Sequence, residues 1–171
     1  ENVFAGNAMS RRVQWQYAVL LQRNPHGHVD QAIGKNVANG NTGLIAPNRL
    51  VKKEVEEITL DGVQMVFQNV PDTEAPVEMN TYFPQFKALW TSELVSATVH
   101  NIYTLRGAQV RNAHNWSKQV ALTLYKFGQE AEVMFASHSW PRWGNARVQE
   151  VLRAQRDAYA NLNNQVLHYA N

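Results

Sequence analysis

An α/β layered fold is predicted for this chain of 171 residues. The patterns along the sequence come in the order β-hairpin, strand, helix, strand and long helix, and such mixing is typical of layered α/β domains. Apolar residues make up 44% of the composition, and five Trp, six Phe and six Tyr supply large side chains for a core. The length fits one domain or part of one.

The first 47 residues carry the weakest structural pattern. A short helix or strand is predicted within residues 1–25, where an apolar stretch runs from Tyr17 to Leu21. Residues 25–47 are rich in Gly and Asn, which is the composition of a loop. A loop of this length in a compact domain is usually functional or covered by other structure.

A β-hairpin is predicted over residues 56–68. Its signal is Asp61-Gly62 between two β-prone runs, because a type I′ turn needs positive φ at both central positions. The second arm alternates imperfectly, which indicates a strand buried on both faces. Further short strands are expected at 86–90 and 132–136.

Two helices are predicted in the second half of the chain. Apolar residues recur at helical spacing from Gly107 to Phe127, and Gly128 is a typical C-terminal stop. The other helix is expected to use Asn145 as its cap and to continue to the end of the chain. Its predicted apolar face comprises Val148, Val151, Leu152, Tyr159, Leu162 and Val166.

Composition and charge argue against several classes of protein. The 16 basic and 14 acidic residues give a net charge of +2, and the basic residues form no run that would bind nucleic acid. The absence of Cys excludes disulfides and thiolate metal ligands. No stretch approaches the roughly 20 apolar residues of a membrane span. Residues 1–12 resemble no signal peptide and lack an initiator Met, so we expect the chain to begin within a longer sequence or after cleavage.

Three side chains that can bind a metal each follow a strand-like run. Glu74 follows the predicted hairpin, Glu93 follows the strand at 86–90, and His138 follows the strand at 132–136. Zinc accepts carboxylate oxygen and imidazole nitrogen, and two metal ions about 4 Å apart can activate a water and polarise an ester oxygen. Composition alone also allows a structural interpretation, with a capping Glu74, a surface Glu93 and a core His138.

Five segments of the chain together resemble a known family of enzymes. They read PNR at 47–49, DGV at 61–63, DTEAP at 72–76, NIYTLRGAQVR at 101–111 and ASHSWPRWGN at 136–145. With them, the block from Leu50 to Asn171 resembles the alkyl sulfatases of the metallo-β-lactamase superfamily, the type that hydrolyses dodecyl sulfate at a binuclear zinc site.

This resemblance implies a division of the chain into two parts. Residues 1–144 would form the C-terminal half of a metallo-β-lactamase-like αββα sandwich, without the upstream half that carries the H-x-H-x-D-H motif. Residues 145–171 would form the first helix of a helical dimerisation region. We therefore expect a partial catalytic domain rather than a complete one.

The resemblance also implies a role for each of the three metal-capable residues. Glu74 resembles a terminal ligand of one zinc ion, Glu93 the carboxylate that bridges both ions, and His138 a terminal ligand of the second. Their spacings of 19 and 45 residues fit the family's pattern and favour Glu74 over its neighbour Glu78. The complete site would hold two zinc ions, so we expect these 171 residues alone to bind metal poorly and to be inactive.

Asn101, Arg106 and Arg111 resemble the residues with which this family holds the sulfate. Arg offers forked donors and a permanent charge to an anion, and the segment precedes a predicted helix, whose free N–H groups favour anions. The two Arg are five residues apart, or about 140° on a helix, so both reach one anion only if Arg106 lies in the preceding loop. The alternative is that one or both form salt bridges with carboxylates.

A second histidine motif is assigned to another role. His26-Gly27-His28-Val29-Asp30 has the form H-x-H-x-D, but Gln31 stands where the superfamily's motif has its last His. Pro25 and Gly27 indicate a loop rather than the end of a strand. We therefore expect this segment to line the substrate entrance and not to bind the catalytic metal.

The predicted function is hydrolysis of alkyl sulfate esters to an alcohol and sulfate, the reaction of a zinc-dependent alkyl sulfatase in detergent degradation. The resemblance implies a homodimer of the full-length protein, in the periplasm or secreted, with no nucleic-acid partner. Cleavage of the C–O or of the S–O bond and the identity of the general acid stay open. The alternatives are another ester hydrolase on the same fold, acting on a phosphate or carboxylic ester, and a noncatalytic module that retains the fold.

Overall fold

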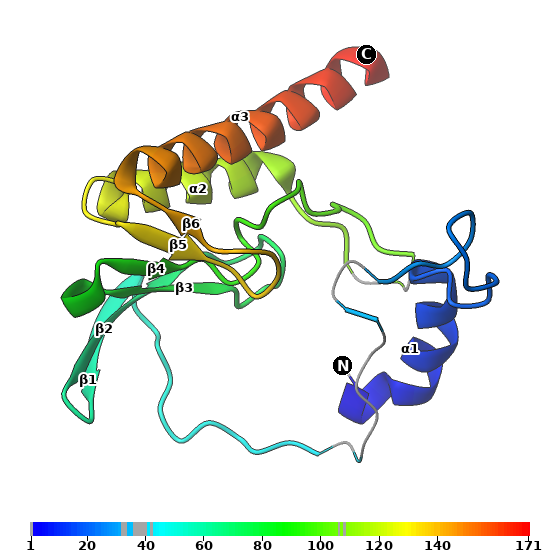
Figure 1. The fold of residues 1–171 in the computed structure, drawn as a ribbon, viewed down its shortest axis with the longest axis horizontal. Coiled ribbons are helices and arrows are strands. Elements are labelled where there is room, and N and C mark those ends of the chain that lie inside the picture. The colour runs from blue at the N-terminus through cyan, green and yellow to red at the C-terminus, as the bar shows by residue number, and fades with distance from the viewer. Residues whose placement is uncertain (1, 32–33, 36–40, 42, 106, 108) are drawn as a thin grey trace. The chain divides into compact units, whose positions relative to one another are not determined.

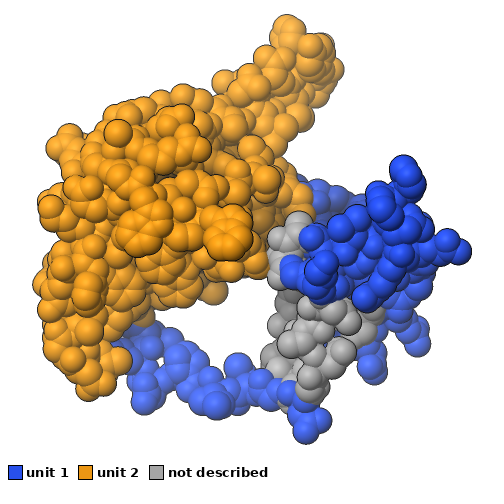
Figure 2. Space-filling model, viewed as in Figure 1, with its two compact units in different colours: residues 1–50, 103–110 blue, residues 51–102, 111–171 orange. Residues whose placement is uncertain are grey.

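The computed structural model describes residues 2–31, 34–35, 41, 43–105, 107 and 109–171. The chain divides into two compact units, each of which is described by itself (Figure 2). The smaller unit comprises residues 1–50 and 103–110, and the larger unit comprises residues 51–102 and 111–171. The predicted boundary between residues 144 and 145 stays a prediction.

The smaller unit contains one helix, α1 (Asn2–Gln16), among its described residues. The helix confirms regular structure within the first 25 residues, but it precedes the apolar stretch instead of including it. Tyr17 to Leu21 form turns, and Ala18 has a φ of 52°, which ends the helical path. The described part of 25–47 contains no helix or strand, in agreement with its Gly- and Asn-rich composition.

The larger unit is built on a six-stranded sheet whose strands follow one another in chain order (Figure 1). The strands are β1 (Val55–Leu60), β2 (Val63–Asn69), β3 (Met79–Phe83), β4 (Ala88–Trp90), β5 (Val133–Phe135) and β6 (Arg142–Trp143). Only the β4–β5 pair is parallel among these described strands, because a helix crosses over between them. The predicted hairpin is confirmed, with Asp61 and Gly62 at φ of 50° and 79°.

Two of these strands were not predicted, and one begins later than expected. β3 lacks alternation because its central residues Asn80, Thr81 and Tyr82 are all buried. β6 has only two residues. The strand expected at 86–90 begins at Ala88, since Pro84–Phe86 form a 3-10 turn that ends at Lys87 in the left-handed conformation.

Two helices pack against each other on one face of the sheet (Figure 1): α2 (Ala113–Phe127) and α3 (Asn145–Ala170). α2 begins six residues later than predicted, because the Asn112 side chain accepts a hydrogen bond from the Asn115 N–H at 3.0 Å and caps the helix there. The described residues 107 and 109–112 therefore precede the helix.

The predicted cap of α3 is wrong by one residue. Gly144 occupies the cap position, where its φ of 88° suits a glycine, and Asn145 is the first helical residue. The Asn145 amide instead donates to the carbonyl oxygens of Gly128 and Ala131, at 2.8 and 2.9 Å. These bonds tie the start of α3 to the end of α2.

The hydrophobic core lies between the two helices and the sheet. Val148, Leu152 and Tyr159 bury the predicted apolar face of α3 over its first half, whereas Val166 is exposed. None of the described helices is long and apolar enough to cross a membrane. The fully buried centre of the core includes Val70, Leu89, Leu94, Trp116, Val120, Ala131, Val148 and Leu152.

Candidate metal centre

One end of the sheet collects the three residues that the sequence predicts as metal ligands. Glu74 lies in the loop between β2 and β3, Glu93 follows β4, and His138 follows β5. The carboxyl ends of these strands meet because β3 is antiparallel to both β2 and β4, while β5 runs parallel to β4. We call this end of the sheet the site end.

Backbone hydrogen bonds hold the loop of Glu93 to the loop of His138. The Thr91 N–H donates to the Phe135 carbonyl at 2.9 Å, and the Ser137 N–H donates to the Ser92 carbonyl at 2.8 Å. Ser92 has a φ of 48°, which turns the chain sharply after β4. The strand pairing thus continues past both strand ends and fixes Glu93 relative to His138.

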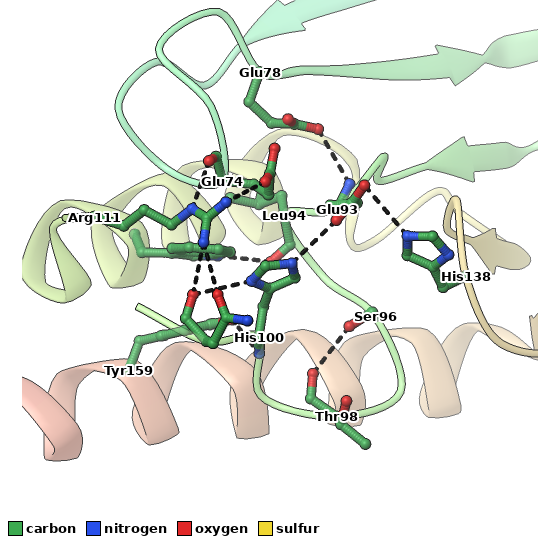
Figure 3. A network of polar contacts seen from close by, with 12 residues as sticks. Glu74, Glu78, Glu93, Leu94, Ser96, Thr98, His100, Arg111, His138 and Tyr159 are labelled. Carbon is green, nitrogen blue, oxygen red and sulfur yellow. Dashed lines mark hydrogen bonds and ion pairs between the residues drawn. The ribbon is translucent and has the colours of Figure 1, made fainter. Parts of the chain in front are cut away.

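The carboxylate of Glu93 lies between two imidazole rings (Figure 3). Its Oε2 is 3.1 Å from His100 Nε2, and its Oε1 is 3.3 Å from His138 Nε2. The hydrogen bond from His100 is the largest cause of the lowered pKa of Glu93; burial opposes it and the charge of His138 adds to it. A carboxylate that presents each oxygen to a different histidine has the shape required of a ligand that bridges two metal ions.

A group that can hold a metal ion is present among the described residues. Glu74, Glu93 and His100 each offer one ligand atom, and these atoms all lie within 4.8 Å of one another. The donor set is oxygen and imidazole nitrogen, which suits zinc. His100 is not among the residues predicted as ligands, because it follows no strand and its sequence surroundings carry no metal motif.

The second nitrogen of His100 also has a partner. Nδ1 lies 3.0 Å from the main-chain carbonyl oxygen of Asn101, an arrangement that fixes the ring and directs Nε2 toward Glu93. Burial lowers the pKa of His100, but the bonds to Glu93 and to Asn101 outweigh it, so the pKa lies above its ordinary value. Metal-binding histidines characteristically have their other ring nitrogen held in this way.

Arg111, predicted to bind sulfate, is buried and makes hydrogen bonds from all three guanidinium nitrogens. Nε donates to the Glu74 carbonyl at 2.6 Å, Nη1 donates to Asn101 Oδ1 at 2.7 Å, and Nη2 pairs with the Glu74 carboxylate. The alternative from the sequence, a salt bridge to a carboxylate, is therefore present at this residue. Arg106 lies outside the described residues, and sulfate binding by the three residues stays a prediction.

Glu78, the alternative to Glu74 as a predicted ligand, forms a hydrogen bond with the main chain of Glu93. Its Oε1 accepts a hydrogen bond from the main-chain N–H of Glu93 at 3.1 Å. Burial is the largest cause of its raised pKa, and the charges of Glu74 and Glu93 add to the shift. Glu78 therefore orients the backbone of Glu93, and it does not belong to the metal-capable group.

The second histidine motif forms no such group among the residues that the structure describes. His28 is buried, and its main-chain N–H donates to the Gln22 carbonyl at 2.9 Å. Gly27 is required at its position, because a Cβ there would lie 2.1 Å from that carbonyl oxygen. The motif is thus part of a tight turn in the smaller unit.

Over its whole length, the chain is similar to curated alkyl and aryl sulfatases. No family model matches the chain. Over its whole length, the chain is 44% identical to the alkyl/aryl-sulfatase BDS1 of Saccharomyces cerevisiae, of which it covers 26%. The chain spans about a quarter of the length of the curated relatives it matches.

Solved structures agree with the sequence comparison. The stereoselective inverting sec-alkylsulfatase Pisa1 from Pseudomonas sp. superposes with a TM-score of 0.93 at 42% identity, covering 100% of this chain and 27% of that one. A metallo-β-lactamase family protein from Thermus thermophilus has a TM-score of 0.51 at 15% identity, covering 67% of this chain and 36% of that one, and shows the fold alone. The predicted resemblance to alkyl sulfatases and the predicted metallo-β-lactamase-like α/β fold are both confirmed.

Proposed function

We propose that this chain is the part of an alkyl sulfatase that supplies one side of a binuclear zinc site, and that the complete protein hydrolyses alkyl sulfate esters to an alcohol and sulfate. The observation that carries the proposal is the carboxylate of Glu93 between His100 and His138. Similarity to sulfatases over the whole chain supports the sulfate ester as substrate.

The ligand set that we propose extends the one predicted from sequence. Glu74 and His100 would hold one zinc ion, His138 would hold the other, and Glu93 would bridge them. The chemistry that zinc supplies when bound is a lower pKa for its water and polarisation of an ester oxygen. Further ligands would come from outside these 171 residues, so the chain alone would retain little metal and show no activity.

The residues of this chain would each perform a definite task around that site. The Asn101 carbonyl holds the His100 ring, and Arg111 holds the Glu74 carboxylate against the Asn101 side chain. Asn101, Arg106 and Arg111 are the proposed contacts of the sulfate.

We propose C–O cleavage rather than S–O cleavage. Pisa1 is described as an inverting sec-alkylsulfatase. Inversion at a secondary carbon follows when water attacks that carbon opposite the departing sulfate, so that the water oxygen enters the alcohol. Hydrolysis in water enriched in ¹⁸O would place the label in the alcohol, whereas label in the sulfate would indicate S–O cleavage.

The first experiment is elemental analysis for zinc on this chain and on a chain extended upstream. About two zinc ions in the extended protein and almost none in the 171 residues would support the proposal. Stoichiometric zinc in the short chain would mean that the ligand set is wrong. The next candidate ligands would then be His26, His28 and Asp30. Zinc in neither protein would favour a noncatalytic module.

Substrate comparison then separates the remaining classes of hydrolase. The extended protein should hydrolyse a long-chain alkyl sulfate faster than the matching alkyl phosphate or carboxylic ester. A preference for either of the other esters would identify a different hydrolase on the same fold. A homodimer of the full-length protein, and its export to the periplasm or outside the cell, are further proposals, tested by sedimentation and by fractionation.

A further inference from the structure

A stacked aromatic pair lies beside His100 of the candidate metal centre. The rings of Trp116 on α2 and Tyr159 on α3 are 4.6 Å apart at an interplanar angle of 17°, and both residues are essentially inaccessible to solvent. The ring centroids of His100 and Trp116 are 5.7 Å apart. The pair therefore connects the helical layer to the site end of the sheet.

Each member of the pair uses its polar atom to hold the loop that carries the ligands. Trp116 Nε1 donates to the Leu94 carbonyl at 2.8 Å, one residue after Glu93. The Tyr159 hydroxyl accepts the main-chain N–H of His100 at 2.9 Å (Figure 3). The two hydrogen bonds thus bracket the segment 94–100.

That segment contains no helix or strand of its own. Glu93, which precedes the segment, and His100, which ends it, are nevertheless close enough for their side chains to meet at 3.1 Å. The loop has local hydrogen bonds, such as those from the Leu94 N–H to the Thr91 carbonyl at 2.9 Å and from Ser96 Oγ to the Thr98 carbonyl at 3.0 Å, but these do not join the main chain at its two ends. Irregular residues between them have other backbone conformations open to them. The separation therefore depends on groups outside the loop.

We propose that Trp116 and Tyr159 are positioning residues for the metal centre, which fix the main chain at Leu94 and His100 and thereby the separation of the Glu93 and His100 ligand atoms. The ligand concerned is a divalent transition-metal cation. This inference rests on the proposed function for the use of the metal, and on the hydrogen bonds described above for the positioning.

The same core contains a matched control. Tyr82 is buried, stacks on Phe127 at 5.0 Å and 28°, and has its hydroxyl 3.4 Å from the Glu130 carboxylate. It lies on β3 and contacts the end of α2, away from the ligand loop. Tyr82→Phe and Tyr159→Phe therefore each remove one hydroxyl from a buried, stacked tyrosine, but only the second change touches the metal centre.

Two measurements test the proposal on the zinc-binding extended protein and on this chain. Cobalt(II) affinity, followed by its visible absorption, should fall about 10-fold in Tyr159→Phe and stay unchanged in Tyr82→Phe. Amide hydrogen exchange without metal should accelerate at residues 94–100 in Tyr159→Phe relative to the rest of the core. Trp116→Phe removes the Nε1–H donor and part of the ring. It should also lower cobalt affinity and accelerate exchange at residues 94–100.

Equal cobalt affinity in Tyr159→Phe and the parent protein would overturn the proposal, as would equal loss in the Tyr82→Phe control. If the parent protein binds no cobalt, the proposed function is wrong. Amide hydrogen exchange at residues 94–100 then tests the positioning role by itself. Unchanged protection of residues 94–100 in Tyr159→Phe would overturn that role in either case.

Discussion

The two ends of the six-stranded sheet are built in different ways. At the site end, the loops are long and hold Glu74, Glu93 and His138. At the opposite end, which we call the turn end, the connections are the tight turn at Asp61-Gly62 and the 3-10 turn at 84–86. The turn end reverses the chain between strands, whereas the site end carries the candidate metal ligands.

The contacts at the two ends also differ in the groups that they hold. At the turn end, Gln85 joins the two turns by accepting from the Gln64 N–H at 3.0 Å and donating to the Gly62 carbonyl at 2.9 Å. At the site end, Arg111 reaches back to Glu74 across 37 residues. Changes at the turn end should therefore alter stability alone, and changes at the site end should alter metal binding as well.

The largest effect is expected from Arg111→Met. This change leaves the largely buried carboxylate of Glu74 without its partner, and such a loss costs about 3 kcal/mol of unfolding free energy. Urea denaturation of the metal-free protein measures it. Arg111→Lys, which keeps the charge but cannot bond to Glu74 and Asn101 together, should lose less. A loss of unfolding free energy below about 1 kcal/mol in the Met variant would show that water solvates the Glu74 carboxylate there.

Glu93→Gln is expected to produce the next largest effect, on metal affinity. A neutral amide would be a poor substitute for a carboxylate that bridges two metal ions, so cobalt affinity in the zinc-binding protein should fall by about 100-fold or more. Without metal, the variant should also be less stable than the parent near pH 7, because the lowered pKa of Glu93 means that its ionised form stabilises the fold. Unaltered cobalt binding would remove Glu93 from the ligand set.

Gly62→Ala should give a smaller effect, confined to stability. The φ of 79° at Gly62 is strained for a residue with a Cβ, although no atom lies within 4 Å of the place where that Cβ would be. The expected cost is about 1 kcal/mol. Gly62→Asn should recover part of it, since Asn tolerates this conformation better. Any change in metal affinity in either variant would break the distinction between the two ends.

Glu78→Gln should produce the smallest effect, and one that depends on pH. Because the folded state raises the pKa of Glu78, its ionised form destabilises the fold once the pH exceeds the ordinary pKa of the carboxyl. Gln can still accept from the Glu93 N–H but carries no charge. Without metal, the variant should therefore be more stable than the parent near pH 7. The difference should disappear below pH 4.5, the ordinary pKa of the group, and a difference of the same size there would contradict the assignment.

Local patterns were sufficient to predict much of the fold. The Asp61-Gly62 hairpin, the stop at Gly128 and the mixed α/β class depend on neighbouring residues, whose conformational preferences act wherever they occur. β3 was missed because Asn80 is buried against α2, where its amide donates to Thr123 Oγ1 at 2.9 Å. A polar residue buried by a distant partner leaves no alternation in the strand.

The candidate site also has features that the sequence predicted and features that only the structure revealed. The sequence by itself predicted that Glu74, Glu93 and His138 each follow a strand, because runs of β-prone residues are a local signal. The tertiary structure showed that these strands end at the same edge of the sheet. Only the tertiary structure decided that His100 meets the second oxygen of Glu93 and that Arg111 pairs with Glu74. Those contacts depend on where irregular loops are held by α2 and α3, and hydrogen bonds between segments distant in sequence have no local signature.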